Sequence, residues 1–314
     1  MSDSDSPAPS IQVQDLSYRF QDGSLGLTNV NIDLPAGSRT LFIGGKTYTP
    51  PPALSLLSAP YHSRTASSLT IATRLLQTAN GAGKTTLLRL LAGKRLSPNN
   101  TITIGGKDPF KEGLEGVTYL GMEWVLNSIV RSDIDIPTLL ASVGGNAYPE
   151  RRDELVEILD IDLRWRMHTV SDGERRRVQL AMGLLRPWRV LLLDEITVDL
   201  DLLTRSNFLA FLKRETEIRP CTIVYATHIL DNLAHWPTHL VHMHLGNVRQ
   251  FGEMEKFRSD TRESSENSQL GEIVLKWLKE DLEARGPRNG PRTEAKSYEA
   301  LQGIGGYGLE KADR

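Results

Sequence analysis

The stretch Asn80-Gly81-Ala82-Gly83-Lys84-Thr85-Thr86 decides the fold, because it is most of a loop that binds the phosphates of a nucleotide. Backbone N–H groups can approach phosphate oxygens only where no Cβ intervenes, and Gly81 and Gly83 meet that need. Lys84 would reach the β- and γ-phosphates, and the Thr85 hydroxyl would complete the shell of a Mg²⁺ ion. A helix over residues 85–92, ended by Gly93, would direct its N-terminal dipole at the anion.

Upstream of this loop the motif is interrupted. The consensus G-x-x-x-x-G-K-[ST] requires a glycine where Thr78 stands. The apolar strand that should lead into the loop ends far earlier, at Gly44, and joining Gly44 directly to Ala79 would restore a complete strand and loop. The intervening residues 45–78 contain three consecutive prolines, no acidic residue and no period of 2 or 3.6.

Two interpretations of residues 45–78 stay open. In the first interpretation they are a retained intron. The genetic code permits this, because the codons of residues 45–47 can contain a GTAAG donor site and those of residues 78–79 a CAG acceptor site. They are otherwise a surface loop that emerges beside the nucleotide. Because long loops without secondary structure are uncommon inside compact domains, the first interpretation is favoured.

Composition limits the function classes. The 314 residues suffice for one large domain or two modest ones, and 37 basic against 39 acidic residues give no argument for binding nucleic acid or an anionic membrane. The basic run at residues 175–177 is expected to be a solvated helix face rather than an RNA contact. The single cysteine, Cys221, suits a reducing compartment and is expected in the core.

The N-terminus is not expected to be a signal peptide. Residues 1–10 are predicted to be disordered, and they lack the basic start and apolar centre of a signal peptide. No apolar run approaches the ~20 residues of a membrane helix. We therefore expect a soluble protein without a transmembrane segment, in the cytoplasm and possibly also in the nucleus, and a nucleic-acid partner stays uncertain.

The first part of the chain predicts an antiparallel sheet. Residues 11–20 and 27–34 alternate between apolar and polar side chains, with turn residues after each segment. Tyr18 and Phe20 at the edge of this sheet would either stack on an adenine ring or simply pack within the sheet.

Beyond the loop helix, residues 111–186 are interpreted as a mostly helical insertion, apart from a short strand at residues 116–121. Ser171 and Glu174 form an S-x-x-E capping box, which predicts a helix start. At such a start, Ser171 and the backbone of Gly173 would present donors to a second phosphate surface.

Two further strands end in residues suited to catalysis. Residues 190–193 are four apolar residues followed by Asp194 and Glu195, which is typical of a strand covered on both faces in a parallel sheet. At the carboxyl end of that strand, Asp194 would hold Mg²⁺ through water and Glu195 would polarise the water that attacks the γ-phosphate. His228 ends a second buried strand, where it would sense the γ-phosphate or only cap the strand.

Together these motifs resemble the ATP-binding cassette (ABC) ATPases over about residues 11–257. Residues 80–86 look like the Walker A loop, residues 171–174 like a variant of the signature LSGGQ, Asp194 and Glu195 like Walker B, residues 199–201 like the D-loop, and His228 like the switch histidine. The resemblance implies an α/β, P-loop NTPase fold: an ABC-type nucleotide-binding domain with an antiparallel β subdomain and a helical subdomain. It also implies ATP and Mg²⁺ as cofactors, with Asp201 of the D-loop and Gly44 near the nucleotide.

The family also implies an assembly. ATP on one cassette is completed by Ser171 and Gly173 of another, so a chain with one cassette is expected to form a homodimer. The sequence departs from the family at the Q-loop glutamine, where Met122 or Glu123 stands, and at two signature positions. The aromatic residue expected on adenine aligns best with Phe20.

A narrower group is similar at residues 162–168, 170–179, 197–201 and 225–229. These stretches resemble the soluble fungal ABC ATPases associated with the Carbon Catabolite Repression–Negative On TATA-less (CCR-NOT) complex and their plant relatives. The resemblance implies ATP hydrolysis coupled to the regulation of transcription or mRNA turnover. The alternatives are the ATP-binding subunit of a multi-chain ABC transporter and a nucleotide-dependent scaffold that hardly hydrolyses ATP.

The remaining residues, 258–314, are interpreted as a C-terminal extension. Apolar residues recur there at helical spacing and predict an amphipathic helix that packs on the domain or binds a partner, the first being favoured: Leu270, Ile273, Val274, Trp277, Leu278 and Leu282. Residues 286–314 are expected to be a disordered tail. Five histidines between residues 228 and 244 do not predict a metal site, because His242 and His244 are expected on one face of an edge strand without carboxylate or cysteine spacing to complete it.

Overall fold

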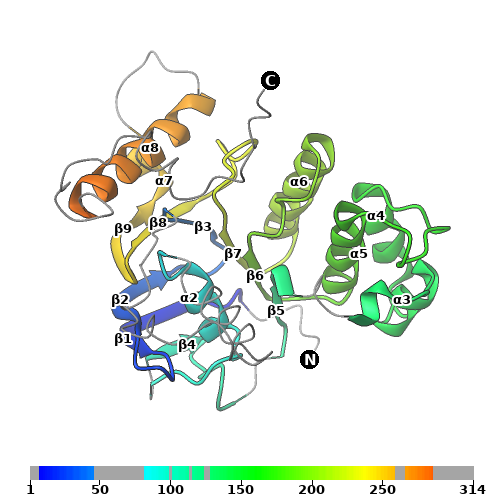
Figure 1. The fold of residues 1–314 in the computed structure, drawn as a ribbon, viewed down its shortest axis with the longest axis horizontal. Coiled ribbons are helices and arrows are strands. Elements are labelled where there is room, and N and C mark those ends of the chain that lie inside the picture. Colours follow the sequence, from blue (N-terminus) through cyan, green and yellow to red (C-terminus); the bar gives the residue numbers. More distant parts are fainter. Residues whose placement is uncertain are drawn as a thin grey trace, which may run out of the picture.

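The computed structural model describes residues 7–45, 81–98, 101–112, 115–123, 128–258 and 266–285. The predictions for residues 1–6, for residues 46–78 of the interruption, for Asn80 and for the tail at residues 286–314 lie outside this part of the chain. The described part forms two sheets with helices around them (Figure 1).

The larger sheet has six strands in the order β5-β6-β7-β3-β8-β9. Its strands are β3 (Arg39–Ile43), β5 (Val117–Leu120), β6 (Val190–Asp194), β7 (Thr222–Ala226), β8 (His239–His244) and β9 (Asn247–Glu253). Neighbouring strands are parallel except for the antiparallel pair β8 and β9. All residues of β6 and β7 are buried, as expected for strands with both faces covered. The carboxyl ends of the parallel strands therefore meet at one edge.

The smaller sheet is antiparallel, as predicted. It consists of β1 (Ile11–Arg19), β2 (Leu25–Leu34) and β4 (Ile102–Ile104), in the order β2-β1-β4. Its buried face shares one apolar cluster with α2 (Lys84–Leu91) and with one face of the larger sheet. Helix α2 starts one residue before the predicted range, and Gly93 follows it with a φ of 63°, the left-handed conformation of a helix stop.

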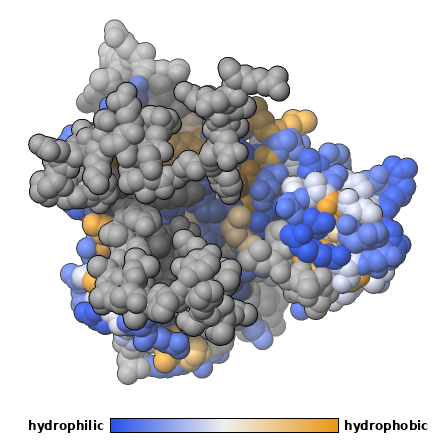
Figure 2. Space-filling model, viewed as in Figure 1, coloured by the Kyte–Doolittle hydropathy of each residue, from blue (hydrophilic) through white to orange (hydrophobic). Residues whose placement is uncertain are grey.

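A helical part lies beyond β5 and β6, at the right of Figure 1. It contains the 3₁₀ helix η4 (Ser128–Arg131) and the helices α3 (Ile136–Ser142), α4 (Pro149–Ile158) and α5 (Asp172–Leu184). The prediction that the helical insertion begins at residue 111 is wrong at its start, because β5 pairs with β6 and belongs to the main sheet. On the face visible in Figure 2, the helical part is mostly hydrophilic.

The C-terminal helix packs on the domain. After α6 (Leu202–Ile218) and the short α7 (Met254–Phe257), α8 (Glu266–Arg285) lies near β8. The Trp277 ring stacks on His242 with centroids 4.9 Å apart, and Asp281 Oδ2 lies 2.9 Å from His242 Nε2. Asp281 Oδ1 lies 3.1 Å from His244 Nδ1. Packing of the predicted amphipathic helix is confirmed, except that Leu282 is 55% exposed.

Two smaller predictions need correction. Strand β8 is not an edge strand, because β9 pairs with its outer side. Residues 7–10 are held on the domain rather than disordered: the Thr222 hydroxyl donates to the Pro9 carbonyl at 2.7 Å, and Gly105 N donates to the Ser10 carbonyl at 2.8 Å.

The structure places the single cysteine and shows the length and polarity of the described helices. Cys221 is buried as expected, and burial raises the pKa of its thiol to about 11. None of the helices in the described ranges is both long enough and apolar enough to cross a bilayer.

Candidate functional site

The end of β3 meets the phosphate loop although residues 46–80 separate them in sequence. A Cβ on Gly44 would lie 2.6 Å from the Cβ of Ala82 and 2.4 Å from the carbonyl oxygen of Met243. The Lys84 Nζ donates to the Gly44 carbonyl at 2.9 Å. The two halves of the interrupted motif therefore lie side by side, and Gly44 occupies a position without room for a side chain.

Gly83 shapes the end of α2 that would receive phosphate. It is the N-cap of α2 with a φ of 92°, and a Cβ there would lie 2.8 Å from Leu27 Cδ2. Gly81 also has a positive φ, of 31°. The first turn of α2, with Thr85 and Thr86, contains no acidic residue, and its backbone N–H groups have no partners within the helix. This end of the helix fits an anion such as a triphosphate.

Asp194 accepts hydrogen bonds on both carboxylate oxygens. Thr85 Oγ1 donates to Oδ1 and the Tyr119 hydroxyl donates to Oδ2, each at 3.0 Å. Asp194 is 4% exposed, and this burial raises its pKa, while the two hydroxyl donors act in the opposite direction. A hydroxyl and a carboxylate are oxygen ligands of the kind that Mg²⁺ prefers. Thr85 and Asp194, the residues predicted to hold Mg²⁺, therefore lie together and fit the ion.

Glu195 and His228, predicted to be catalytic, are in direct contact. Glu195 Oε2 lies 2.7 Å from His228 Nδ1 and accepts from His228 N at 3.2 Å, while Oε1 lies 3.9 Å from Lys84 Nζ. Glu195 has a φ of 54°, which is uncommon for a residue with a side chain, and its N–H donates to the Ala226 carbonyl at 2.9 Å. Such a backbone conformation persists where the surroundings fix it, often at functional sites.

The predicted signature residues form a second surface. Ser171 is the N-cap of α5 and shares a capping box with Glu174, which confirms the predicted helix start. A Cβ on Gly173 would lie 2.8 Å from the carbonyl oxygen of Asp199, so α5 approaches the D-loop too closely for a larger residue. Strands β5 and β6 lie between α2 and α5 in Figure 1.

Asp201, predicted to contact nucleotide, has a structural role within the chain. It is the N-cap of α6, accepting from Thr204 N at 3.0 Å, and it forms an ion pair with Arg177 at 2.7 Å. Hydrogen bonds from Thr204 lower the pKa of Asp201 to about 2. A contact between Asp201 and nucleotide stays a prediction.

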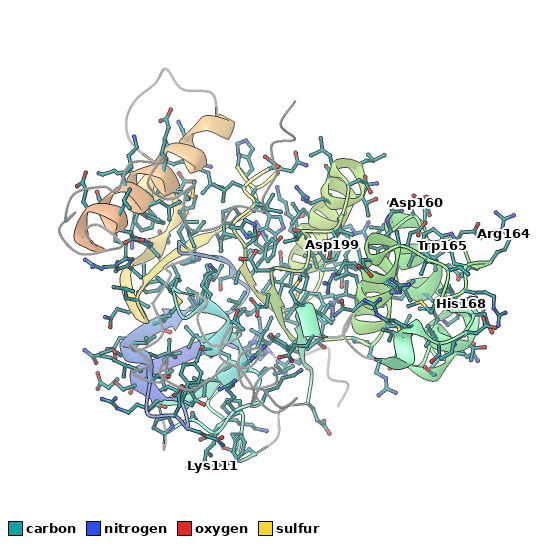
Figure 3. The ribbon with its side chains drawn as sticks, viewed as in Figure 1. Lys111, Asp160, Arg164, Trp165, His168 and Asp199 are labelled. Carbon is teal, nitrogen blue, oxygen red and sulfur yellow. The ribbon has the colours of Figure 1, made fainter. Side chains whose placement is uncertain are left out.

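The arginines at residues 175–177 do not form a solvated face, contrary to expectation. Arg175 and Arg176 are 7% and 1% exposed, and the Arg177 guanidinium lies 2.7 Å from Asp160 Oδ2. Arg176 pairs with Asp199 at 3.3 Å, and Figure 3 shows Asp199 between α6 and the helical part. Arg175 and Arg176 are buried where the start of α5 packs against the D-loop, and Arg177 is half-buried, so the run does not present a free basic surface to RNA.

Phe20 packs in a small aromatic group at the edge of the smaller sheet. Its ring meets Tyr18 edge to face with centroids 5.4 Å apart, and the Arg95 guanidinium lies 5.4 Å from the Phe20 centroid. Arg95 also donates to the Tyr18 hydroxyl at 3.0 Å. These contacts explain both aromatic residues as packing, and stacking of Phe20 on adenine stays a prediction.

Tyr119 lies beside Asp194 but was not among the predicted site residues. At the position where the family's glutamine is absent, Met122 is 44% exposed and Glu123 forms an ion pair with Arg89. Tyr119, near the carboxyl end of β5, instead supplies a hydrogen-bond donor to the Asp194 carboxylate. The sequence placed Tyr119 near the end of the strand predicted at residues 116–121, which was the available signal. It did not show that this strand pairs with the strand that ends in Asp194.

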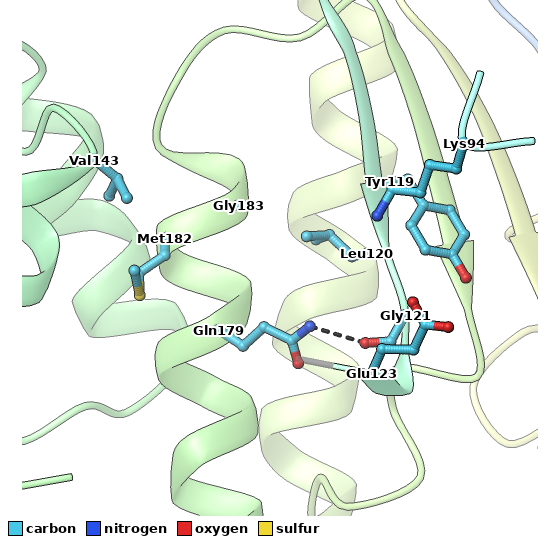
Figure 4. A pocket seen from close by; sticks show the side chains of 9 residues that line it. All are labelled: Lys94, Tyr119, Leu120, Gly121, Glu123, Val143, Gln179, Met182 and Gly183. Carbon is cyan, nitrogen blue, oxygen red and sulfur yellow. Dashed lines mark hydrogen bonds between the residues drawn. The ribbon is translucent and has the colours of Figure 1, made fainter. Parts of the chain in front are cut away.

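A cavity of about 400 Å³ opens where the sheet meets the helical part, and Figure 4 shows its lining. Tyr119, Gly121 and Glu123 line one side, and residues of α5, among them Gln179, line the other. Gln179 Nε2 donates to the Gly121 carbonyl at 2.9 Å and joins α5 to the end of β5. In the described ranges no group of three or more histidine, cysteine or acidic residues is placed to hold a metal.

Comparisons with known proteins agree with this geometry. The family described as "ABC transporter" matches residues 75–198. CCR4-associated factor 16 of Saccharomyces cerevisiae is 39% identical over 307 residues, covering 86% of this chain and 94% of the yeast protein. ABC transporter I family member 20 of Arabidopsis thaliana is 43% identical over 229 residues, covering 69% of this chain and 68% of the plant protein.

The solved structures agree on the fold. The structure of cbiO1 from Clostridium perfringens, described as part of the ABC transporter complex cbiONQ, has a TM-score of 0.57 at 19% identity, covering 88% of this chain and 96% of that chain. A nucleotide-free ATP-binding cassette from an ABC transporter has a TM-score of 0.59 at 14% identity, covering 86% of this chain and 98% of that chain. At these identities the likeness concerns the fold alone, and it confirms the predicted fold class.

Proposed function

Because the chain belongs to the ABC family of ATP-binding domains, we propose that it binds ATP with Mg²⁺, hydrolyses it within a homodimer, and uses this cycle as a regulatory subunit. The observation that carries the proposal is the contact between Glu195 and His228 beside Lys84 and Asp194, at the carboxyl edge of the sheet. This edge holds each kind of group that phosphoryl transfer to water requires: a cation, a metal-binding carboxylate and a base.

In the proposed mechanism, each residue has one task. Lys84 and the N–H groups at the start of α2 would bind the phosphates, and Thr85 and Asp194 would hold a Mg²⁺ ion, which would supply positive charge to the phosphate oxygens. Glu195 orients the attacking water and accepts its proton. The His228 ring, 2.7 Å from Glu195 Oε2, keeps that carboxylate turned toward the γ-phosphate.

The proposed homodimer is supported by two separate surfaces of one chain, the start of α2 and the start of α5. Ser171 and Gly173 begin α5 in the helical part, beyond β5 and β6 from α2 (Figure 1), so a second copy would bring them to the nucleotide. Near the D-loop, Val198, Leu202 and Leu203 are 39%, 62% and 70% exposed. A symmetric interface that covers these apolar side chains would place two nucleotides between the copies.

Glu195→Gln tests the dimer. It removes the proposed base while keeping the shape of the side chain, so ATP should stay bound and the closed dimer should accumulate. Sedimentation velocity with Mg²⁺ and ATP should show a dimer for Glu195→Gln and a monomer for Glu195→Gln combined with Lys84→Ala, whose phosphate-binding cation is missing. A Glu195→Gln protein that stays monomeric at saturating ATP would contradict the proposal.

For the regulatory role we propose an association with a CCR-NOT type complex, with a nuclear as well as a cytoplasmic pool. The support is the similarity to CCR4-associated factor 16, which covers 94% of that yeast protein. Purification of the tagged native protein from its own cells, followed by mass spectrometry, should recover subunits of that complex. Recovery of an integral membrane protein instead would favour the alternative, a transporter subunit.

For residues 45–78 we propose a retained intron. The proposal is supported by the contact of Gly44 with Ala82, because the two sides of the interruption already lie together. Tryptic digestion of the native protein should then give the peptide TLFIGANGAGK, with Gly44 joined to Ala79. The peptide TLFIGGK would contradict the proposal and favour a genuine inserted loop and a scaffold that hydrolyses little ATP.

A further inference from the structure

Asp194 is the buried carboxylate that the proposed function assigns to Mg²⁺, and its orientation depends on a second residue. Its Oδ1 accepts from Thr85, which belongs to the same metal site, whereas Oδ2 accepts from the Tyr119 hydroxyl at 3.0 Å. A carboxylate that accepts one donor on each oxygen cannot rotate about its terminal bond without losing a hydrogen bond in a nearly dry site. The Tyr119 hydroxyl is therefore one of the two donors that fix the orientation of the Asp194 carboxylate.

Tyr119 is itself held from several sides. In the strand pairing it lies opposite Leu192 of β6, two residues before Asp194. The Lys94 ammonium group lies 4.5 Å from the centre of its ring. Arg89, one helical turn after Thr85 on α2, forms an ion pair with the exposed Glu123. Burial and the Asp194 carboxylate raise the pKa of the Tyr119 hydroxyl, while the nearby Arg89 acts in the opposite direction. The ring thus has a fixed place between β6 and α2.

The strand that carries Tyr119 also contacts the helical part. Leu120 points to the opposite side of β5 from Tyr119, toward α5 (Figure 4), and a Cβ on Gly183 would lie 2.3 Å from Leu120 Cδ2. Two residues beyond Tyr119, the Gly121 carbonyl accepts from Gln179 Nε2 at 2.9 Å. A short segment, residues 119–121, therefore contacts α5 at one end and Asp194 at the other.

We propose that Tyr119 is a positioning residue of the magnesium site: its hydroxyl holds the Asp194 carboxylate in the orientation that the metal requires, at the place where the chain lacks the family's glutamine. The inference rests on the proposed function, because it takes Asp194 as a metal ligand. Tyr119 would act through Asp194 and would not itself contact the phosphates or the water.

Tyr119→Phe tests the inference, since it removes the hydroxyl and keeps the ring between Lys94 and β6. The full chain is titrated with a non-hydrolysable ATP analogue, once with Mg²⁺ and once with EDTA, and the rise in melting temperature is measured relative to the ligand-free protein of each variant. A second readout is the affinity for Mn²⁺ in the presence of the analogue, by electron paramagnetic resonance. Tyr148→Phe, which removes a tyrosine hydroxyl from the helical part, is the matched control.

For Tyr119→Phe we expect the metal affinity to fall by about 10- to 100-fold, the factor for one hydrogen bond to a charged group that orients a metal ligand, with nearly unchanged binding of the analogue in EDTA. Tyr148→Phe should match the wild type in both. Equal metal affinity in Tyr119→Phe and wild type would overturn the inference while leaving the proposed function intact. Equal losses with Mg²⁺ and with EDTA would also overturn it, because they would indicate general damage to the site. If the wild type binds no analogue under either condition, the proposed function fails and the inference fails with it.

Discussion

Gly44→Ala should damage the nucleotide site of this protein although residue 44 is separated from the phosphate loop by more than thirty residues of sequence. The added Cβ would lie 2.4 Å from the Met243 carbonyl oxygen and 2.6 Å from the Ala82 Cβ. Neither atom can rotate away, since one is backbone and the other is fixed to the backbone. The end of β3 and the loop must therefore move apart, at a cost of about 1–3 kcal/mol in the free energy of unfolding.

The same movement would displace the Gly44 carbonyl from Lys84 Nζ, now 2.9 Å away, and shift the lysine from its place between β3 and Glu195. We expect the affinity for Mg²⁺ with an ATP analogue to fall by about tenfold, which corresponds to ~1.4 kcal/mol. Urea unfolding measures the first effect and isothermal titration calorimetry the second.

Gly252→Ala is the matched control for this experiment. Its Cβ would lie no closer than 3.6 Å to any neighbour, which is an ordinary van der Waals contact. It should therefore change stability by less than about 0.5 kcal/mol and leave the affinity as it is. If Gly44→Ala were as stable as Gly252→Ala and bound the analogue equally well, the strand would not meet the loop as the structure indicates, and the assembled site would be refuted.

Three further predictions concern the parts around the site. Trp277→Ala should destabilise the docking of α8 by about 3–5 kcal/mol, seen as faster amide exchange in α8, whereas Leu282→Ala, at a position 55% exposed, should change little. Asp201→Ala should cost about 1 kcal/mol in urea unfolding, because α6 loses its N-cap, and Asp201→Asn should cost only a few tenths, since asparagine also caps helices. Burial lowers the pKa of His244, so the folded state favours the neutral ring. The contribution of this ring to the free energy of unfolding is therefore fully present above its ordinary pKa of about 6.5 and is lost as the pH falls below that value. Thermal melting between pH 7.5 and 5.5 should show this loss, and His244→Gln should reduce it; an unchanged slope in that variant would contradict the assignment.

The fold could be predicted because its motifs are local in sequence and each carries its own physical reason. The capping box of Ser171 and the buried run before Asp194 depend on neighbours within a few residues, so their structures follow from short stretches. The contact of Gly44 with Ala82 was inferable for another reason: the two halves of the interrupted motif are recognisable on either side.

The errors concern contacts between segments distant in sequence. The arginines at residues 175–177 are charged, and only the packing of α5 against the D-loop explains why Arg176 is 1% exposed. Strand β8 could not be placed inside the sheet without knowing that β9 pairs with it. Tyr119 was missed because its partner, Asp194, lies 75 positions later, and only the parallel pairing of β5 with β6 brings the two together.

The most direct test of the account is the release of phosphate from ATP by the protein purified from its own cells, measured in parallel for the wild type and Glu195→Gln with saturating Mg²⁺. If the edge of the sheet is an active ATPase site, the wild type should hydrolyse ATP. The rate of Glu195→Gln should be at least about 100-fold lower, because the proposed base is gone. Equal and negligible rates in the two proteins would contradict the account and leave a domain that binds nucleotide without hydrolysing it.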